Sequence, residues 1–175
     1  MKTNKTMIIT GPLGALKTTL ARQLSDALGM PLLCKDDIKA SLFDKAKGKK
    51  DSKALSQATF LNMLKQLPSL SSVILEANFK QNEYDQLIAL LQELDRPRIT
   101  LYLSAEAKVL YQRYTKRQKN RHPAHLAYQT MSFKHFQQSI DEHTLNVFNE
   151  NVLYIDTTTF TPQDFNLLQK KLRMA

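Results

Sequence analysis

The chain has 175 residues, of which 42% are hydrophobic and 23% are charged. This balance is typical of a folded globular protein and excludes a wholly disordered chain, a collagen-like repeat and an integral membrane protein. The length predicts a single domain over residues 1–175, large enough to bury a sizeable core. The formal net charge of +9 favours polyanionic or phosphorylated partners.

The compartment is indicated by the cysteine content and by the N-terminal residues. Cys34 is the only cysteine, so an internal disulfide is excluded and a reducing, cytoplasmic location is predicted. The apolar stretch Thr6–Thr10 is too short for a signal peptide or a membrane span, and we expect no membrane partner. The sequence does not indicate an oligomeric state.

Taken in chain order, apolar runs alternate with amphipathic stretches. Five short runs predict buried strands at Thr6–Thr10, Pro31–Cys34, Ser72–Leu75, Arg98–Leu103 and Asn151–Ile155. Helices are predicted at Lys17–Leu28, Ile38–Phe43, Ala54–Leu67, Tyr84–Leu94, Ala105–Arg117, Met131–Phe148 and Pro162–Leu172. Exposed loops are predicted at Lys45–Lys53 and Lys119–Tyr128. This alternation predicts an α/β fold, in which a parallel sheet is covered on both faces.

The segment between the first strand and the first helix carries the strongest functional signal. It reads Gly11-Pro12-Leu13-Gly14-Ala15-Leu16-Lys17-Thr18-Thr19, which is typical of a phosphate-binding P-loop. Backbone N–H groups of such a loop and of the helix N-terminus converge on an anion. We expect ATP and Mg²⁺ as ligands, with Lys17 on the outer phosphates and the Thr18 hydroxyl on the metal.

One position departs from the pattern Gly-x-x-x-x-Gly-Lys-Ser/Thr. Leu16 stands where the second glycine belongs. Its backbone N–H can still donate, but a positive φ at this position would cost a leucine roughly 1–2 kcal/mol. Leu16 therefore leaves open whether the loop binds nucleotide fully, weakly or not at all.

Further motifs in chain order resemble those of the small P-loop kinases, in the group of polynucleotide 5′-kinase, chloramphenicol phosphotransferase and the zeta toxins. They are the phosphate loop, Lys35-Asp36-Asp37-Ile38-Lys39, Val73-Ile74-Leu75-Glu76-Ala77-Asn78-Phe79, the arginines around Arg121-His122-Pro123, and Ile155-Asp156-Thr157. The resemblance implies the three-layer fold of the P-loop NTPases. That fold has a five-stranded parallel sheet in the order 2-3-1-4-5 and a helical lid, here over approximately residues 113–128.

The resemblance also implies roles on the acceptor side of the site. Asp36 would accept the proton of a substrate hydroxyl as general base. The alternative is that Asp36 or Asp37 only caps the following helix. Lys39, one turn further on, could hold an anionic substrate group or could be a solvated surface lysine.

At the end of the third strand, Glu76 corresponds to an acidic Walker-B residue. Ligands in parallel sheets bind beyond the carboxyl ends of the strands, and a carboxylate there can hold Mg²⁺. A solvated loop carboxylate is the alternative. Asn78, with Phe79, would face the acceptor.

Residues 107–140 contain no acidic residue but several basic ones, among them Arg113, Arg117 and Arg121. Arg113 and Arg117 are four residues apart and share a helix face. The resemblance makes this segment a lid whose arginines close on the nucleotide phosphates, Arg117 and Arg121 reaching the transferring group. A solvated basic helix face is the alternative.

Together these features predict a kinase that transfers the γ-phosphate of ATP to a hydroxyl of a small molecule or nucleotide. A polynucleotide 5′-kinase, favoured by the net charge, is a second possibility. A regulatory nucleotide-binding module with a degenerate P-loop is a third, supported by Leu16. The four histidines match no zinc pattern, so no structural metal is expected.

Overall fold

A computed structural model describes residues 5–47, 51–118, 121–125, 131–142, 144–147 and 151–174. Its strands are β1 (Thr6–Thr10), β2 (Leu32–Cys34), β3 (Val73–Glu76), β4 (Arg98–Ser104) and β5 (Val152–Asp156). Its α-helices are α1 (Lys17–Leu28), α2 (Lys35–Lys45), α3 (Ser52–Gln66), α4 (Gln81–Glu93), α5 (Ala107–Gln118), α6 (Phe133–Glu142) and α7 (Pro162–Met174). Two short 3₁₀ helices lie at Leu67–Ser69 (η1) and Pro123–His125 (η2).

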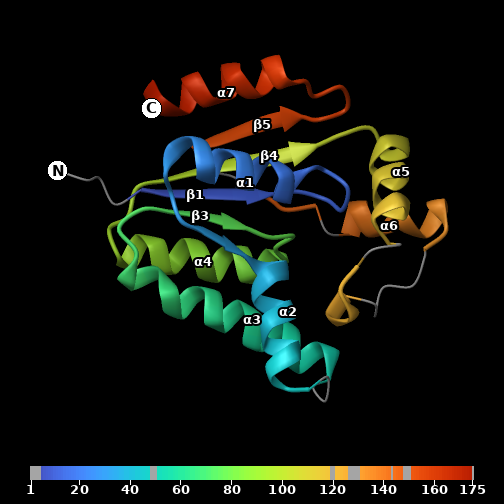
Figure 1. Cartoon of the computed structure of the whole chain (residues 1–175), viewed down its shortest axis with the longest axis horizontal. Helices are drawn as coiled ribbons and strands as arrows, with labels where there is room; N and C mark the ends of the chain where they lie inside the picture. Colours follow the sequence, from blue (N-terminus) through green and yellow to red (C-terminus); the bar gives the residue numbers. More distant parts are fainter. Residues whose placement is uncertain are drawn as a thin grey trace.

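The five strands form one parallel sheet in the order β2-β3-β1-β4-β5, as predicted. All arrows in Figure 1 point toward the side of the molecule where α5 and α6 lie. The loops that follow β1, β2 and β3 therefore gather at one edge of the sheet, which is where ligands bind in such folds.

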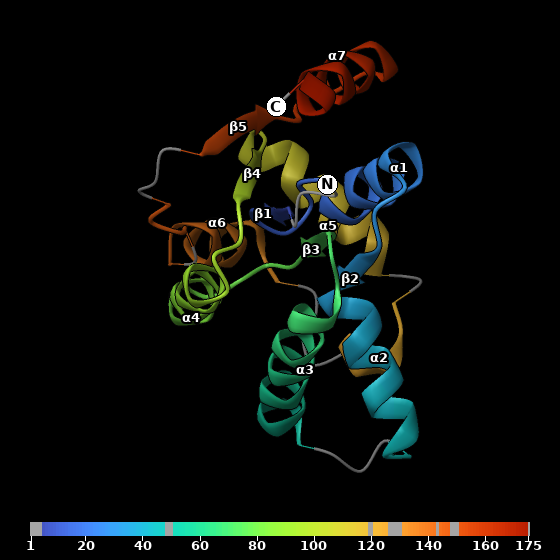
Figure 2. The same cartoon turned by 90° about the vertical axis from the view of Figure 1, so that its left-hand side faces the viewer.

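Helices cover both faces of the sheet, which gives three layers. In the turned view of Figure 2, α1 and α7 lie on one side of the sheet and α4 lies on the other. The alternation of side chains along β1 explains this arrangement. Met7 and Ile9 pack with α1 and α7, whereas Ile8 packs with α3 and α4.

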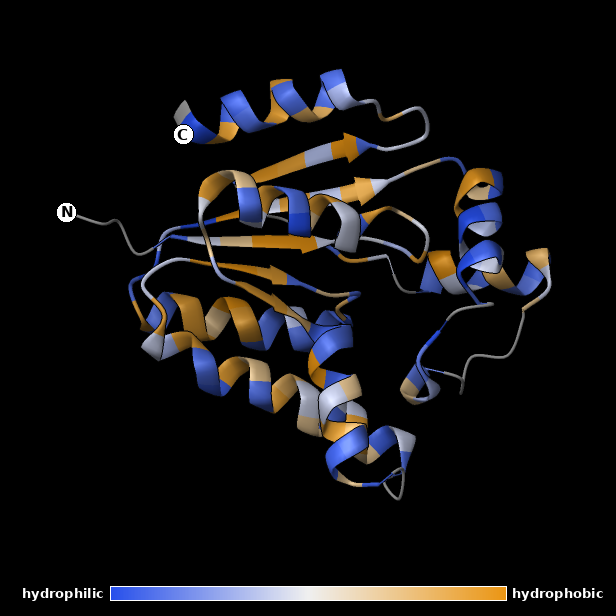
Figure 3. Ribbon diagram, viewed as in Figure 1, coloured by the Kyte–Doolittle hydropathy of each residue, from blue (hydrophilic) through white to orange (hydrophobic). Residues whose placement is uncertain are grey.

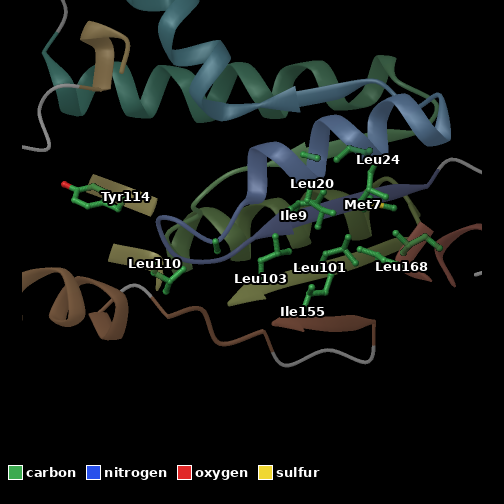
Figure 4. Packing of buried hydrophobic residues seen from close by; sticks show 14 of the residues in the cluster. Met7, Ile9, Leu20, Leu24, Leu101, Leu103, Leu110, Tyr114, Ile155 and Leu168 are labelled. Atoms are coloured by element: carbon green, nitrogen blue, oxygen red, sulfur yellow. The ribbon is translucent and has the colours of Figure 1, made fainter. Parts of the chain in front are cut away.

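Two apolar clusters make up the core. Figure 4 shows the first, in which side chains from α1, such as Leu20 and Leu24, meet Leu101 and Leu103 of β4. The ribbon in Figure 3 is correspondingly hydrophobic along the central strands and striped along the covering helices. This pattern is expected where strands are buried on both faces and helices on one.

Three predicted helices differ from the observed ones by three residues or more, and one of them, predicted at Tyr84–Leu94, begins at Gln81. The helix predicted at Ile38–Phe43 begins three residues earlier, at Lys35. The helix predicted at Met131–Phe148 ends at Glu142, because the segment 144–147 is not helical and buries Leu145 and Val147 in the second cluster. Parts of the two predicted loops and of the predicted lid lie outside the described residues. These parts are residues 48–50, 119–120 and 126–130.

The start of the last helix agrees with the prediction from the sequence. Thr161 and Asp164 form reciprocal hydrogen bonds at the start of α7, and Pro162 is its first residue. Among the helices that the structure describes, none is long and apolar enough to span a membrane.

Candidate functional site: a phosphate loop facing a carboxylate and lid arginines

The loop between β1 and α1 has the backbone of a phosphate cradle. Gly11 and Gly14 have φ values of 138° and 83°. A Cβ atom at these positions would lie 2.1 Å from the Leu103 carbonyl oxygen and 2.3 Å from the Leu110 carbonyl oxygen, respectively. Both glycines are therefore required by conformation and by space, which explains why half of the chain's four glycines stand here.

Leu16 adopts the backbone conformation that a glycine would take at its position. Its φ of 61° and ψ of 17° lie in the left-handed region, directly before the first residue of α1. For a leucine this conformation costs roughly 1–2 kcal/mol. Leu16 is thus held in a conformation that a glycine adopts readily.

The Lys17 side chain folds back over the loop. Its ammonium donates to the Pro12 carbonyl at 2.8 Å, and the residue is only 8% exposed. Burial lowers the pKa of Lys17, while Glu76 and Asp36 oppose this effect. Lys17 therefore lies close to both candidate carboxylates of the site.

A buried carboxylate from β3 faces the first turn of α1. Glu76 is 4% exposed, and its Oε2 accepts from the Thr18 hydroxyl at 3.3 Å and from the Cys34 thiol at 2.8 Å. Burial raises the pKa of Glu76, and Lys17 opposes this shift. The strand register pairs Cys34 with Glu76. Burial overturns the alternative that Glu76 is a solvated loop residue.

Asp36 meets basic side chains from the last turn of α5 and from the segment that follows it. Its carboxylate lies 3.4 Å from Arg117 Nη2, 3.7 Å from Arg121 Nη2 and 3.9 Å from His125 Nδ1. The helix begins at Lys35 with Cys34 as its N-cap, so neither Asp36 nor Asp37 is the capping residue. Asp37 instead points outward, where it pairs with the exposed Arg22 at 3.3 Å.

The three predicted lid arginines separate into two groups. Arg117 and Arg121 contact Asp36, whereas Arg113 donates to the Thr157 and Thr158 carbonyls at 2.8 and 3.3 Å. Arg113 also lines the cavity over the phosphate loop together with Arg117. It therefore joins α5 to the loop after β5 at the border of that cavity.

The cavity runs along the phosphate loop and has a volume of about 500 Å³, which lies within the range of ligand pockets. Its lining combines residues 14–19 with Arg22, Gln23, Arg113 and Arg117. Gly11 lies beneath it, against β4, and Pro12 and Leu13 face α6. Most of the predicted loop residues are thus brought to one cavity.

Asn78 and Phe79 were expected to face the acceptor, but only Phe79 is fully buried. Asn78 lines a small space between Pro12, Leu13 and α6. Phe79 is 1% exposed and packs edge-on against Phe60. The expectation that Phe79 faces the acceptor is therefore wrong, because its ring completes the core beside α3.

Two contacts were not predicted from the sequence. Lys35 pairs with both carboxylate oxygens of Glu83 at 2.6 Å, over the rings of Phe60 and Phe79. His125 is buried beside Asp36, and desolvation lowers the pKa of His125 although Asp36 opposes this shift. The motif Arg121-His122-Pro123 was the only signal near His125, and no local pattern links Lys35 to Glu83, 48 residues away.

The side chains fit nucleotide and Mg²⁺ better than a metal cluster. Gly11 and Gly14 give the loop the positive φ values of an anion-binding turn, and Thr18 and Glu76 supply the oxygen atoms that Mg²⁺ prefers. No group of three or more His, Cys, Asp or Glu side chains suited to a metal occurs within the described ranges.

Comparison with known proteins agrees with this geometry. A family model described as an AAA domain matches residues 7–141. No curated protein matches the sequence at a significant level.

Among solved structures, a protein of Chloroflexus aurantiacus, described provisionally as a kinase, is 27% identical with a TM-score of 0.81, over 98% of both chains. Kti12 of Chaetomium thermophilum, in complex with ADP-AlF3, is 14% identical with a TM-score of 0.69, over 97% of this chain and 98% of that one. A gluconokinase of Sinorhizobium meliloti is 14% identical with a TM-score of 0.60, over 98% and 97%. The predicted resemblance to P-loop kinases is confirmed.

Proposed function

Since the chain belongs to the AAA domain family, we propose that it is an ATP-dependent kinase that transfers the γ-phosphate to a hydroxyl of a small molecule or nucleotide. One observation carries this proposal. Arg117 lines the phosphate-loop cavity and also contacts Asp36 at 3.4 Å. A module that only binds nucleotide needs no carboxylate at this point, whereas phosphoryl transfer to a hydroxyl does.

On the phosphate side, the loop would bind the nucleotide through backbone N–H groups of residues 14–18 and the N-terminus of α1. Lys17 would exchange its contact with the Pro12 carbonyl for the outer phosphates. Thr18 and Glu76 would hold Mg²⁺ directly or through its water. Bound Mg²⁺ would neutralise charge on the transferring phosphate.

On the acceptor side, Asp36 would orient the hydroxyl and accept its proton. The hydroxyl oxygen would form a bond to the γ-phosphorus while the bond from that phosphorus to the bridging oxygen breaks, which releases ADP. Arg117 and Arg121 would neutralise the phosphoryl oxygens. Since both now contact Asp36, their transfer to the phosphates would also free the carboxylate to act as base.

The two other functions predicted from the sequence have less support. The left-handed conformation of Leu16 weakens the argument for a degenerate loop, because Leu16 adopts the positive φ that a glycine would take at this position. No feature within the described segments favours a polynucleotide acceptor over a small one. The Chloroflexus protein, which is described provisionally as a kinase and is 27% identical to this chain, supports the proposal that this chain is a phosphotransferase.

The proposal is tested by titrating Mg-ATP into wild type, Lys17→Ala and Asp36→Asn in a calorimeter. We expect micromolar binding in wild type and roughly 100-fold weaker binding in Lys17→Ala, since about 3 kcal/mol of phosphate contact is lost. Asp36→Asn should bind nearly as wild type, because Asp36 faces the acceptor.

Turnover separates a kinase from a binding module. ADP formation, with water or an added alcohol as acceptor, should fall by about 10²–10⁴-fold in Asp36→Asn. Asp37→Asn, the adjacent exposed carboxylate, is the matched control and should keep wild-type turnover. Absence of Mg-ATP binding in wild type, or full turnover in Asp36→Asn, would contradict the proposal.

A further inference from the structure

The proposed transfer leaves Lys39 and Cys34, both buried, without a role. Lys39 is 7% exposed, so the alternative that it is a solvated surface lysine is wrong. Cys34 is 2% exposed and is the only cysteine of the chain. It ends β2, and the strand register pairs it with Glu76 at the end of β3. The thiol therefore lies beside the carboxylate proposed to hold Mg²⁺.

The contact between Cys34 and Glu76 is a hydrogen bond between two buried side chains. The thiol donates to Glu76 Oε2 at 2.8 Å. An ionised carboxylate only accepts, so the thiol supplies the proton. A buried cysteine normally behaves as a small apolar side chain. At this position its polar hydrogen has a defined partner, which is a group of the candidate site.

Two donors hold the same oxygen of Glu76. The Thr18 hydroxyl, in the first turn of α1, donates to Oε2 at 3.3 Å, so this atom is held from α1 and from β2 together. Ordering a glutamate side chain costs rotamer entropy, which these two bonds offset. In the proposed complex the Thr18 oxygen also ligates the metal, whereas the thiol takes no part in coordination. Cys34 is thus the donor that acts on Glu76 alone.

We propose that Cys34 is a positioning residue, whose thiol orients the Glu76 carboxylate for the Mg²⁺ of the bound nucleotide. The inference rests on the proposed function, because it takes Glu76 as a group that holds the metal directly or through its water. Partners that orient such groups change metal affinity by about 10–100-fold when they are removed. A serine in place of Cys34 could still donate, whereas an alanine could not.

The hydrogen bond can be observed by infrared spectroscopy, because the S–H stretching band of the protein arises from Cys34 alone. Glu76→Gln should move this band to higher frequency, since a neutral amide oxygen is a weaker acceptor than a carboxylate. Mg-ADP should move it in the same direction, because the metal draws charge from Glu76, while ADP without metal should leave it in place. A band that neither Glu76→Gln nor Mg-ADP moves would overturn the inference.

Metal affinity tests the consequence of the hydrogen bond. Each protein is saturated with ADP, and Mn²⁺, which takes the same oxygen ligands as Mg²⁺, is titrated while free Mn²⁺ is followed by electron paramagnetic resonance. Cys34→Ala should weaken Mn²⁺ binding about 10-fold or more, whereas Cys34→Ser should stay within about threefold of wild type. Val73→Ala truncates a buried residue at the other end of β3 and should lower the Tm but keep the wild-type Mn²⁺ affinity.

A cysteine that only fills space would give a different result. Serine and alanine are similar in volume, so both variants would then bind Mn²⁺ alike, and this outcome would overturn the inference. Wild-type Mn²⁺ affinity in Cys34→Ala would do the same.

Glu76→Gln keeps the two proposals apart. If it weakens Mn²⁺ binding while Cys34→Ala does not, the inference fails and the metal role of Glu76 stands. If Glu76→Gln binds Mn²⁺ as wild type does, Glu76 does not hold the metal and the inference fails with that assignment. If wild type shows the Cys34 effect but transfers no phosphate to any hydroxyl, the kinase proposal fails and the inference stands.

Discussion

The two sides of the candidate site are built in different ways. The phosphate side is formed by backbone and short buried side chains at the edge of the sheet, with Gly11 and Gly14 against carbonyls of other segments and Glu76 held by Thr18 and Cys34. The acceptor side is formed by charged side chains, of which the Arg117 side chain is 54% exposed and the Arg121 side chain 9%.

This difference separates a preformed part of the site from an adjustable one. The backbone of the loop can bind phosphates without moving, and on this side only the Lys17 side chain would change its partner. Ion pairs between partly exposed side chains are worth little and can be exchanged for contacts with a ligand. The acceptor side can therefore change its contacts as the reaction proceeds.

The largest effect is expected from adding a methyl group on the phosphate side. Gly14→Ala combines a positive φ with a contact of 2.3 Å to the Leu110 carbonyl oxygen. Strain and overpacking together should lower the free energy of unfolding by about 2–5 kcal/mol and weaken Mg-ATP binding. Chemical denaturation and calorimetry measure the two losses.

Gly29→Ala provides the control for that change. Gly29 also has a positive φ, but a Cβ there would contact nothing within 4 Å. Its cost should be about 1 kcal/mol or less, with unchanged nucleotide affinity. If both variants lost the same stability, steric contact with α5 would not be what requires glycine in the loop.

An intermediate effect is expected from relieving strain at Leu16. Leu16→Gly removes a left-handed leucine, but it also adds chain entropy to the unfolded state. The free energy of unfolding should change by no more than about 1 kcal/mol, and Mg-ATP affinity should stay within about threefold of wild type. A gain of tenfold or more in affinity would instead identify the loop as degenerate.

The smallest effect is expected on the acceptor side, where a change of pH alters the stability of the fold through His125. His125 is buried near Asp36, Arg121 and Lys39, and burial lowers its pKa in the folded state. The unfolded chain therefore binds this proton more readily, so stability should be full above pH ~6.5 and should fall as the pH drops through the lowered pKa.

The His125→Gln variant should show a weaker decrease of Tm with falling pH than wild type. His135→Gln, which removes an exposed histidine of α6, should keep the wild-type dependence. Identical pH profiles for His125→Gln and wild type would mean that His125 is not held as a neutral imidazole beside Asp36.

The comparison also explains what the sequence could predict. The bounds of β1 and α1 and the sheet order were predicted correctly, because a buried apolar run, a glycine-rich turn and a helical period follow one another without interruption. The place of Leu16 in the motif raised a positive φ only as a condition, and the structure has it. These features depend on local sequence.

Features that depend on distant contacts were missed. The end of α6 is set by burial of Leu145 and Val147 against the opposite cluster, although the apolar spacing continues past Glu142. Likewise, the separation of Arg113 from Arg117 depends on the position of Thr157, 44 residues away. Helical periodicity places both arginines on one face but cannot distinguish their partners.

The packing of the two loop glycines has a consequence for synthesis of the chain. Gly11 and Gly14 take their places against Leu103 and Leu110, and β1 pairs with β3 and β4, all far along the chain. A ribosome delivers the N-terminal residues first. The phosphate loop is therefore synthesised early, but the segments of β4 and α5 that contact its glycines are synthesised much later. A nascent chain that ends before β4 would therefore lack Leu103 and Leu110 and could not yet hold nucleotide. Nucleotide would stabilise only chains that have passed α5.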